Sequence, residues 1–163
     1  MTEATASSPL RLIQSRKTLV LATADPEPWC APVYYVYQQQ SFFFFSSKES
    51  RHIRAALASN RCAASIFRDG DDWREIEGLQ MDGKLERVQL GSQAVSVFRA
   101  YLNKLPKVKR SFPELALDLT RFTQHFRTEL YAFVPEQVFY LNNQTGLGKR
   151  REIQLPGKKG VST

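Results

Sequence analysis

The side chains best suited to chemistry lie within residues 46–52, where a run of phenylalanines ends in "SSKESRH". Ser46 and Ser50 supply hydroxyl donors, and Lys48 adds a mobile positive charge. Arg51 can bind an oxyanion through two parallel hydrogen bonds. If a helix begins near Ser50, the free N–H groups of its first turn add further donors for an anion. These residue types at this spacing predict a binding site for a phosphate monoester.

A simpler interpretation fits the triplet Ser50, Arg51 and His52 equally well on spacing alone. Ser50 can be an ordinary helix N-cap, and the two residues after it can be solvated basic side chains. The sequence shows no Ser-His-Asp set, no paired carboxylates and no cluster with metal-ligand spacing, so we assign no catalytic side chain and no metal ligand. If the protein is an enzyme, this favours a bound cofactor as its reactive group.

The composition is that of a single folded domain. The chain has 163 residues, of which 42% are hydrophobic and 24% charged, as in globular proteins rather than disordered ones. We expect one domain over residues 9–155, a disordered lead at 1–8 and a flexible tail at 156–163. The formal net charge of +7 favours anionic partners such as nucleic acid, phosphorylated small molecules or acidic surfaces, without choosing among them.

Two cysteines, Cys30 and Cys62, are far apart in the sequence and belong to no CxxC pair. This spacing argues against a zinc site and predicts free thiols in a reducing compartment. The first residues lack the charged and apolar regions of a signal peptide, and no stretch approaches the ~18 apolar residues of a membrane helix. We therefore expect a cytoplasmic protein that does not enter the membrane.

Short apolar runs separated by turn signals dominate the chain. The period and composition of these runs predict six strands and four helical segments. The strands are expected at 18–25, 29–37, 42–45, 62–67, 76–88 and 129–143, the last interrupted at Pro135, and the helices at 9–17, 50–60, 92–104 and 112–128. Gly78 and Gly83 mark places for a β-bulge or a close approach. The pattern predicts a mainly β fold, a six-stranded antiparallel barrel with inserted helices.

The segment "FFSSKESRH" resembles the phosphate-binding segment of the pyridoxamine 5'-phosphate oxidase-like split barrels, which bind FMN. "LATADPEPWCAPVYYVY" is similar to the first two strands of that family, and "GLQMDGKLERV" to a later one. Together with "YLNKLPKVK" and "NNQTGLGKR", these segments resemble a small bacterial subgroup whose role is not well defined. His52 stands where the family pattern has lysine, which keeps a donor but weakens the fixed positive charge because histidine is largely neutral at pH 7.

The resemblance implies a homodimeric split barrel with FMN at the subunit interface. Residues would be divided among the parts of FMN as follows: Val33, Tyr34 and Tyr35 against the ring, Phe45 and Ser46 at the ribityl chain, Lys48, Ser50, Arg51 and His52 around the phosphate, and Gln80 near the polar edge of the ring. Residues of the second subunit, Gln80 or those of segment 146–150, would complete the site.

The resemblance also implies an FMN-dependent oxidoreductase that acts on a small molecule by hydride transfer at flavin N5. The family's oxidases hold the substrate phosphate with an Arg-x-His pattern, and none follows Glu129 here, which argues against oxidation of pyridoxamine phosphate itself. One alternative is a non-enzymatic module that binds or senses flavin or haem. A second is nucleic-acid binding through the positive charge and aromatic strands, which the family resemblance does not favour.

Overall fold

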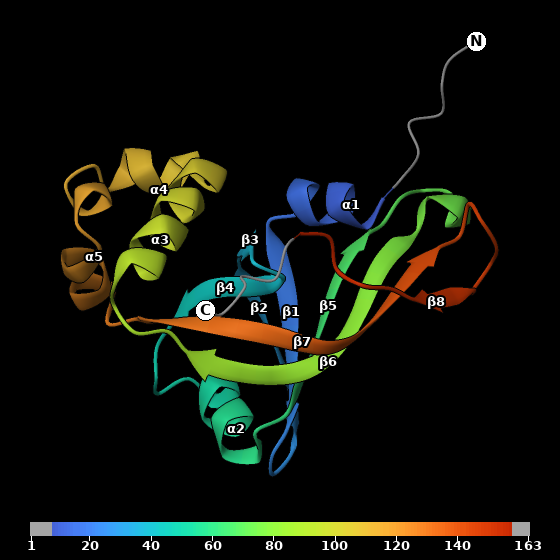
Figure 1. Cartoon of the computed structure of the whole chain (residues 1–163), viewed down its shortest axis with the longest axis horizontal. Helices are drawn as coiled ribbons and strands as arrows, with labels where there is room; N and C mark the ends of the chain where they lie inside the picture. Colours follow the sequence, from blue (N-terminus) through green and yellow to red (C-terminus); the bar gives the residue numbers. More distant parts are fainter. Residues whose placement is uncertain (1–7, 158–163) are drawn as a thin grey trace.

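The computed structural model describes residues 8–157, which form one curled antiparallel sheet with helices around it (Figure 1). The strand order is β2-β1-β5-β6-β7-β4-β3, and β8 pairs with β7. The strands are β1 Thr18–Ala24, β2 Pro28–Tyr34, β3 Val36–Gln38, β4 Ser41–Ser46, β5 Cys62–Arg68, β6 Glu77–Arg87, β7 Glu129–Asn142 and β8 Arg150–Glu152. A mainly β, antiparallel half-barrel is therefore confirmed.

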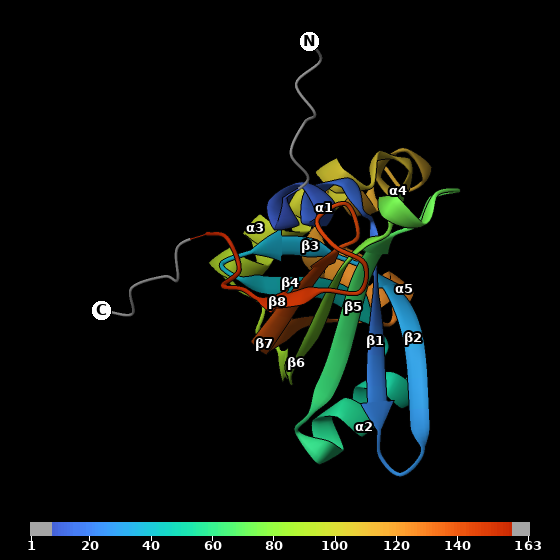
Figure 2. The same ribbon diagram turned by 90° about the vertical axis from the view of Figure 1, so that its right-hand side faces the viewer.

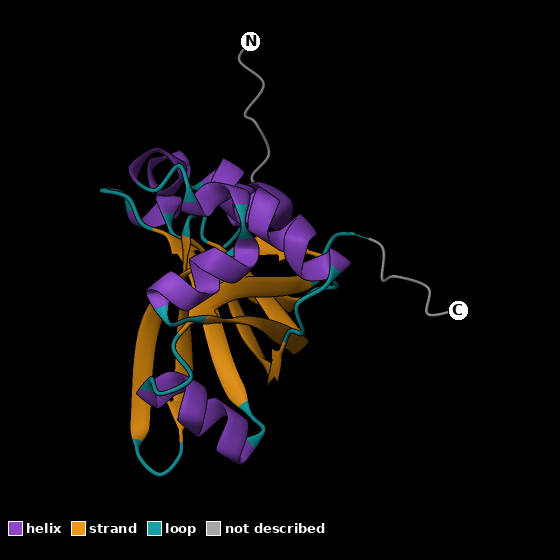
Figure 3. Ribbon diagram, turned by 90° about the vertical axis from the view of Figure 1, so that its left-hand side faces the viewer, coloured by secondary structure: helices purple, strands orange, loops and turns teal. Residues whose placement is uncertain are grey.

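Helices lie at three places around the sheet (Figures 1 and 2). Helix α1 lies at one end of the barrel and α2 near the opposite end, where the hairpin of β1 and β2 turns. Helices α3, α4 and α5 gather beside the ends of β4, β6 and β7 (Figure 3). The bounds are α1 Pro9–Ser15, α2 Arg51–Ser59, α3 Ser92–Lys104, α4 Pro106–Ser111 and α5 Leu119–Phe126, with short 3₁₀ turns at Trp73–Glu75 and Leu115–Leu117.

The four phenylalanines of β4 explain how two hydrophobic cores are joined. Successive side chains of a strand point to opposite faces. Phe42 and Phe44 enter the barrel core, whereas Phe43 and Phe45 pack against the core beneath α3 and α5. Because both faces of β4 are covered, the strand is a continuous apolar run rather than an alternating one.

The outer face of β1, β2, β5 and β6 carries exposed apolar side chains. The strand register places Val20 of β1 beside Pro32 of β2 and Ser65 of β5, and Ser65 beside Gln80 of β6. Tyr34 and Phe67, on the same face, are 52% and 54% exposed. We call this surface the outer sheet face. It differs from the opposite face of these strands, whose side chains fill the barrel core.

A β-bulge separates the two halves of β6 and β7. The pairing shifts between Asp82 and Gly83, so that Asp82 faces Gln137 while Gly83 faces Pro135. A Cβ atom at Gly83 would lie 2.2 Å from the carbonyl oxygen of Val134. The predicted special role of Gly83 is thus confirmed. Pro135 lies between the part of β7 that pairs with β4 and the part that pairs with β8, so its missing N–H costs neither pairing.

The prediction of six strands is wrong, because the sheet formed within residues 8–157 has eight. The run 29–37 divides at Tyr35, whose N–H donates to the carbonyl of Lys17. Before Tyr35 the chain pairs with β1, and after it β3 pairs with β4. The eighth strand, β8, is short and exposed, and has no apolar alternation that sequence analysis could detect. The helical segment expected at 112–128 is a 3₁₀ turn followed by α5.

The predicted ends fall largely outside residues 8–157. Within the described part, Ser8 caps α1 by accepting a hydrogen bond from the N–H of Arg11, and the hydroxyl of Tyr37 donates to the carbonyl of Pro156. Cys30 is exposed, Cys62 is buried, and both are free thiols. Among residues 8–157, no helix is long and apolar enough to cross a membrane.

We predict that Gly83→Ala destabilises the protein by more than about 2 kcal/mol, because the new methyl group would overlap the backbone of β7. Gly78→Ala in the same strand is the matched control, because its Cβ would meet its nearest atom at 3.5 Å, an ordinary contact. Urea denaturation measures the free energy of unfolding of each variant. Equal stability of the two variants would contradict this account of the bulge.

Candidate anion-binding corner

Helix α2 begins with an N-terminus that no side chain caps. Ser50 occupies the N-cap position with extended backbone angles, yet its hydroxyl makes no capping hydrogen bond. It donates instead to the carbonyl oxygen of Ser47 at 2.7 Å. The N–H groups of the first helical turn therefore have no side-chain acceptor among the described residues, which suits them to receive an anion.

Three polar side chains meet beside this helix end. The Ser46 hydroxyl lies 2.9 Å from Nε2 of His52 and 3.2 Å from the hydroxyl of Ser50. Because the Ser50 hydroxyl donates to Ser47, it can accept from Ser46, which in turn can accept from N–H at Nε2 of His52. Hydroxyl hydrogens rotate freely, so both serines can be redirected to an incoming oxyanion. We call Ser46, Ser50, Arg51 and His52, with the first turn of α2, the anion corner.

Burial lowers the pKa of His52 below its ordinary value. The imidazole is therefore mostly neutral at pH 7 and acts as a hydrogen-bonding group. The fixed positive charge of the corner comes from Arg51, which is exposed and forms no ion pair within residues 8–157.

The guanidinium of Arg51 is held over the ring of Trp29, 4.4 Å from the ring centroid. This cation–π contact orients the charged group. Arg51 and Arg54 line a hollow of about 490 Å³ together with Asp25 and Glu49. The two carboxylates offset part of the positive charge there.

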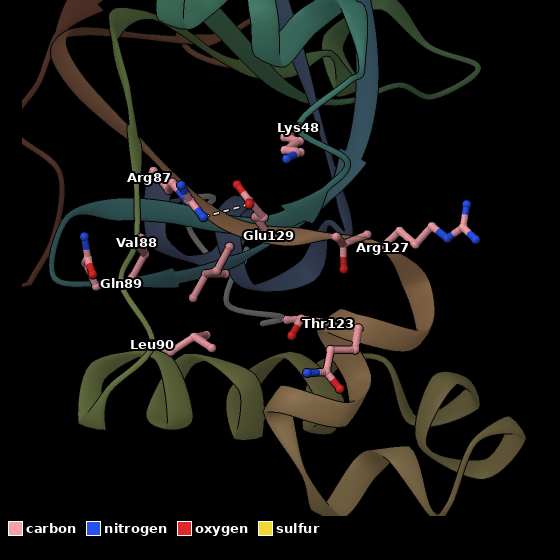
Figure 4. Close-up of a pocket in the computed structure, with 11 residues that line it drawn as sticks. Lys48, Arg87, Val88, Gln89, Leu90, Thr123, Arg127 and Glu129 are labelled. Atoms are coloured by element: carbon pink, nitrogen blue, oxygen red, sulfur yellow. Dashed lines mark hydrogen bonds and ion pairs between the residues drawn. The ribbon is translucent and has the colours of Figure 1, made fainter.

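Lys48 does not join the anion corner. It lines a separate cleft of about 560 Å³ between the end of β6, the start of β7 and the end of α5 (Figure 4). In that cleft, Arg87 and Glu129 form an ion pair at 2.7 Å. Lys48 and Ser50 thus belong to the same turn, but the Lys48 side chain lines the cleft and the Ser50 side chain lies in the anion corner.

The aromatic and apolar residues assigned to the flavin ring divide between the two faces of the sheet. Tyr35 has no exposed surface, and its hydroxyl donates to the carbonyl of Ile13 at 2.6 Å. This corrects the prediction that its side chain lines a flavin ring. Val33 is also in the barrel core, so only its backbone can meet a ligand. Tyr34 and Gln80 are exposed on the outer sheet face.

Phe45 also lies elsewhere than predicted. Its ring packs edge-to-face against Phe98, Tyr101 and Phe122 in the core beneath the helices. Ser46 is the next residue and therefore points to the opposite face of β4. The side chain of Phe45 consequently cannot reach a ribityl chain bound at the corner.

Sequence analysis found the local part of the corner and missed its distant members. Ser46, Ser50 and His52 lie close in sequence and their side chains are together in space, whereas the side chain of Arg51 stacks on Trp29. Trp29 comes from β2 and was not singled out, because its contact with Arg51 depends on how α2 lies against the sheet. The only signal in the sequence was a tryptophan at the start of an expected strand; in the structure its side chain is 44% exposed.

Metal chemistry has no visible donor set in the described part of the chain. Among residues 8–157, no three His, Cys, Asp or Glu side chains lie close enough to hold a metal ion. The anion corner offers hydrogen-bond donors and a guanidinium, and these groups suit an oxyanion.

A curled antiparallel sheet with an anion corner at the start of α2 is the arrangement expected of the FMN-binding split barrels. The family model described as pyridoxamine 5'-phosphate oxidase matches residues 10–126. This match spans most of the chain and includes the barrel strands β1 to β6 together with α2. The chain belongs to the pyridoxamine 5'-phosphate oxidase family.

Solved structures show the same fold at low sequence identity. A heme binding protein from Mycobacterium smegmatis aligns at 15% identity with a TM-score of 0.65, covering 91% of this chain and 58% of that protein. HutZ, a heme storage protein from Vibrio cholerae, aligns at 23% identity with a TM-score of 0.60, covering 80% and 89%. A FAD-binding protein from Mesorhizobium loti aligns at 20% identity with a TM-score of 0.59, covering 81% and 92%. No curated protein matches the chain in sequence.

We predict that stability falls on acidification through His52. Because burial lowers its pKa, the folded protein binds this proton less well than the unfolded chain. The contribution of neutral His52 to the free energy of unfolding is therefore complete above about pH 6.5, the pKa in the unfolded chain. It is lost as the pH falls through the lower pKa of the folded state. In urea denaturation at several pH values, His52→Gln should lose this part of the pH dependence. His125→Gln, exposed on α5, is the matched control, and an identical pH profile in wild type and His52→Gln would contradict the prediction.

Proposed function

We propose that the protein binds FMN, with the FMN phosphate at the anion corner. The observation that carries this proposal is the uncapped start of α2 beside the hydrogen-bonded Ser46, Ser50 and His52. A phosphate could accept hydrogen bonds from the backbone amides, both hydroxyls and the guanidinium of Arg51. The replacement of a lysine by His52 leaves Arg51 as the main charged partner.

The ring of FMN needs more surface than one anion corner provides. We infer that a second copy of the chain packs on the outer sheet face, where Tyr34 and Phe67 are exposed. Gln80 lies on the same face and could contact the polar edge of the ring from either subunit. Strand β2 pairs only with β1 in the described sheet. The register places the backbone N–H and C=O of Val33 toward β1 and those of Tyr34 toward the free edge, where they could meet a flavin.

We propose an oxidoreductase that acts on a small molecule. Bound FMN would supply hydride transfer at its N5 atom. This chain would contribute binding and orientation: the anion corner would fix the phosphate, and β2 would position the ring. This division of labour is supported by the absence from the sequence of any Ser-His-Asp set or paired catalytic carboxylates.

A second candidate is a protein that binds flavin or haem without turning over a substrate. It is supported by the structural similarity to proteins described as heme binding and heme storage. Absorbance spectra of the purified protein with added FMN or added hemin distinguish the two ligands. A protein that takes up FMN but oxidises neither NADH nor NADPH with a panel of acceptors would favour this candidate over the oxidoreductase.

We predict that Arg51→Ala lowers the affinity for FMN by about 30-fold to 1,000-fold. The reason is the loss of the main charged partner of a phosphate dianion, an effect of about 2–4 kcal/mol. Isothermal titration calorimetry or quenching of flavin fluorescence measures the dissociation constant. Arg99→Ala, on the exposed side of α3, removes the same charge at a distance from the corner and should bind FMN like the wild type.

Riboflavin provides a second control for the same site, because it has the ring and ribityl chain but no phosphate. Wild type should prefer FMN to riboflavin strongly, and Arg51→Ala should lose most of that preference. Unchanged FMN affinity in Arg51→Ala would remove Arg51 from the site.

We predict that Phe67→Glu weakens the homodimer by about 100-fold to 1,000-fold. A carboxylate buried without a partner at an interface costs several kcal/mol. Light scattering coupled to size exclusion, over a range of protein concentrations, measures the dimer. Leu117→Glu is the matched control, because Leu117 is 87% exposed near the helical end. A wild type that is monomeric with FMN bound would refute the proposed interface.

A further inference from the structure

The cleft that contains Lys48 is not explained by FMN binding. It lies where the end of β6, the start of β7 and the end of α5 converge, and Figure 4 shows side chains from all three around it. Its volume of about 560 Å³ is within the range of small-molecule sites. The isoalloxazine ring proposed above would extend along β2, which contributes no residue to this cleft.

The charges around the cleft favour an anion. Three cationic side chains line it, those of Lys48, Arg87 and Arg127, against one carboxylate, that of Glu129. Both oxygens of Glu129 are occupied: one accepts from Arg87 at 2.7 Å and the other from the hydroxyl of Tyr131 at 2.9 Å. Burial, followed by this hydrogen bond to Glu129, raises the pKa of Tyr131, so the hydroxyl remains a donor near neutral pH.

Lys48 is the cation best placed to bind such an anion. Within residues 8–157 it forms no ion pair, and Figure 4 shows its side chain above the ion pair of Arg87 and Glu129. One guanidinium nitrogen of Arg87 is paired with Glu129. Its other N–H groups can bind a ligand because the side chain is 64% exposed. Arg127 extends toward the outside of the cleft in Figure 4.

The cleft also has an apolar part. Leu130 lies at its base with 1% exposure, and Leu90 lines it with 55% of its surface exposed. An exposed leucine beside a cationic group gives a site for a molecule with an apolar body and an anionic end. Glu129 is paired with Arg87, and Arg127 extends outward. Among the residues that line the cleft, this leaves Lys48 as the inward cation without a carboxylate partner, and a single positive charge matches a carboxylate monoanion.

We propose that this cleft binds a small carboxylic acid anion with an apolar body, at a place distinct from the proposed FMN site. The carboxylate lies between Lys48 and Arg87, and the apolar body covers Leu90. The binding of a carboxylate here does not require the anion corner to be occupied, although Lys48 lies two positions before Ser50 in the turn that forms the corner.

Benzoate is a suitable probe, and benzamide is its uncharged analogue of the same shape. A ¹H–¹⁵N spectrum of the full-length protein is recorded during titration with each, at constant ionic strength, with and without FMN. We expect benzoate to bind with a dissociation constant of about 1 mM and to shift the amide signals of residues 87–90 and 128–130. Benzamide and inorganic phosphate should bind at least about 5-fold more weakly.

Paired variants test the two halves of the site. Lys48→Ala should weaken benzoate binding at least about 5-fold, and Lys109→Ala, on exposed α4, should leave it unchanged. Leu90→Ser should weaken it about 3-fold to 10-fold through lost apolar contact, whereas Leu117→Ser should not. Leu90→Ser should also keep the FMN affinity of the wild type, which separates this cleft from the anion corner.

Equal shifts with benzoate and benzamide, or benzoate shifts confined to other regions, would overturn the proposal. Benzoate binding at the cleft in a protein that fails to bind FMN would leave the proposal standing and count against the FMN function alone.

Discussion

The burial of β4 on both faces is the constraint on which the anion corner depends. Phe42 and Phe44 fill the barrel, while Phe43 and Phe45 fill the core beneath the helices. A shift of the strand by one residue would still leave phenylalanines on both faces, but it would move Ser41 or Ser46 into a core position that a phenylalanine now fills. The serines at the two ends of the run therefore help to fix its register. Its last residue, Ser46, is therefore held on the barrel side. There it meets His52 of α2, which packs against the same barrel.

The same alternation explains which predictions from sequence were correct. The order of helices and strands follows from apolar period and turn residues, and most of it could be predicted. The polar residues of the corner are within seven positions of one another, so a helix start was enough to bring them together. Which face each aromatic side chain occupies depends on the register between strands, and the sequence of one strand does not contain it. Tyr35 and Phe45 were misplaced for that reason.

Contacts between distant segments were beyond sequence analysis for a related reason. The stacking of Arg51 on Trp29 requires α2 to lie against the end of β2. The cleft near Lys48 requires the ends of β4 and β6 to lie beside the start of β7, and this follows from the order β6-β7-β4 in the sheet. Strands that are neighbours in this sheet are far apart in the sequence, so no short sequence motif predicts that they are adjacent. The ion pair of Arg87 and Glu129 is a direct product of it, because the two residues lie near paired ends of β6 and β7.

One short turn connects the anion corner with the cleft near Lys48. The N–H of Ser50 donates to the carbonyl of Ser47 at 3.1 Å, and the N–H of Glu49 donates to the Ser47 hydroxyl at 3.2 Å. These hydrogen bonds direct Lys48 to the cleft and Ser50 to the corner. An anion bound on either side would restrict the same turn, so binding at one surface lowers the entropy lost on binding at the other. Any such coupling must be reciprocal. Its size is limited by how rigid the turn already is, because a turn held firmly by the two hydrogen bonds to Ser47 has little entropy left to lose when an anion binds.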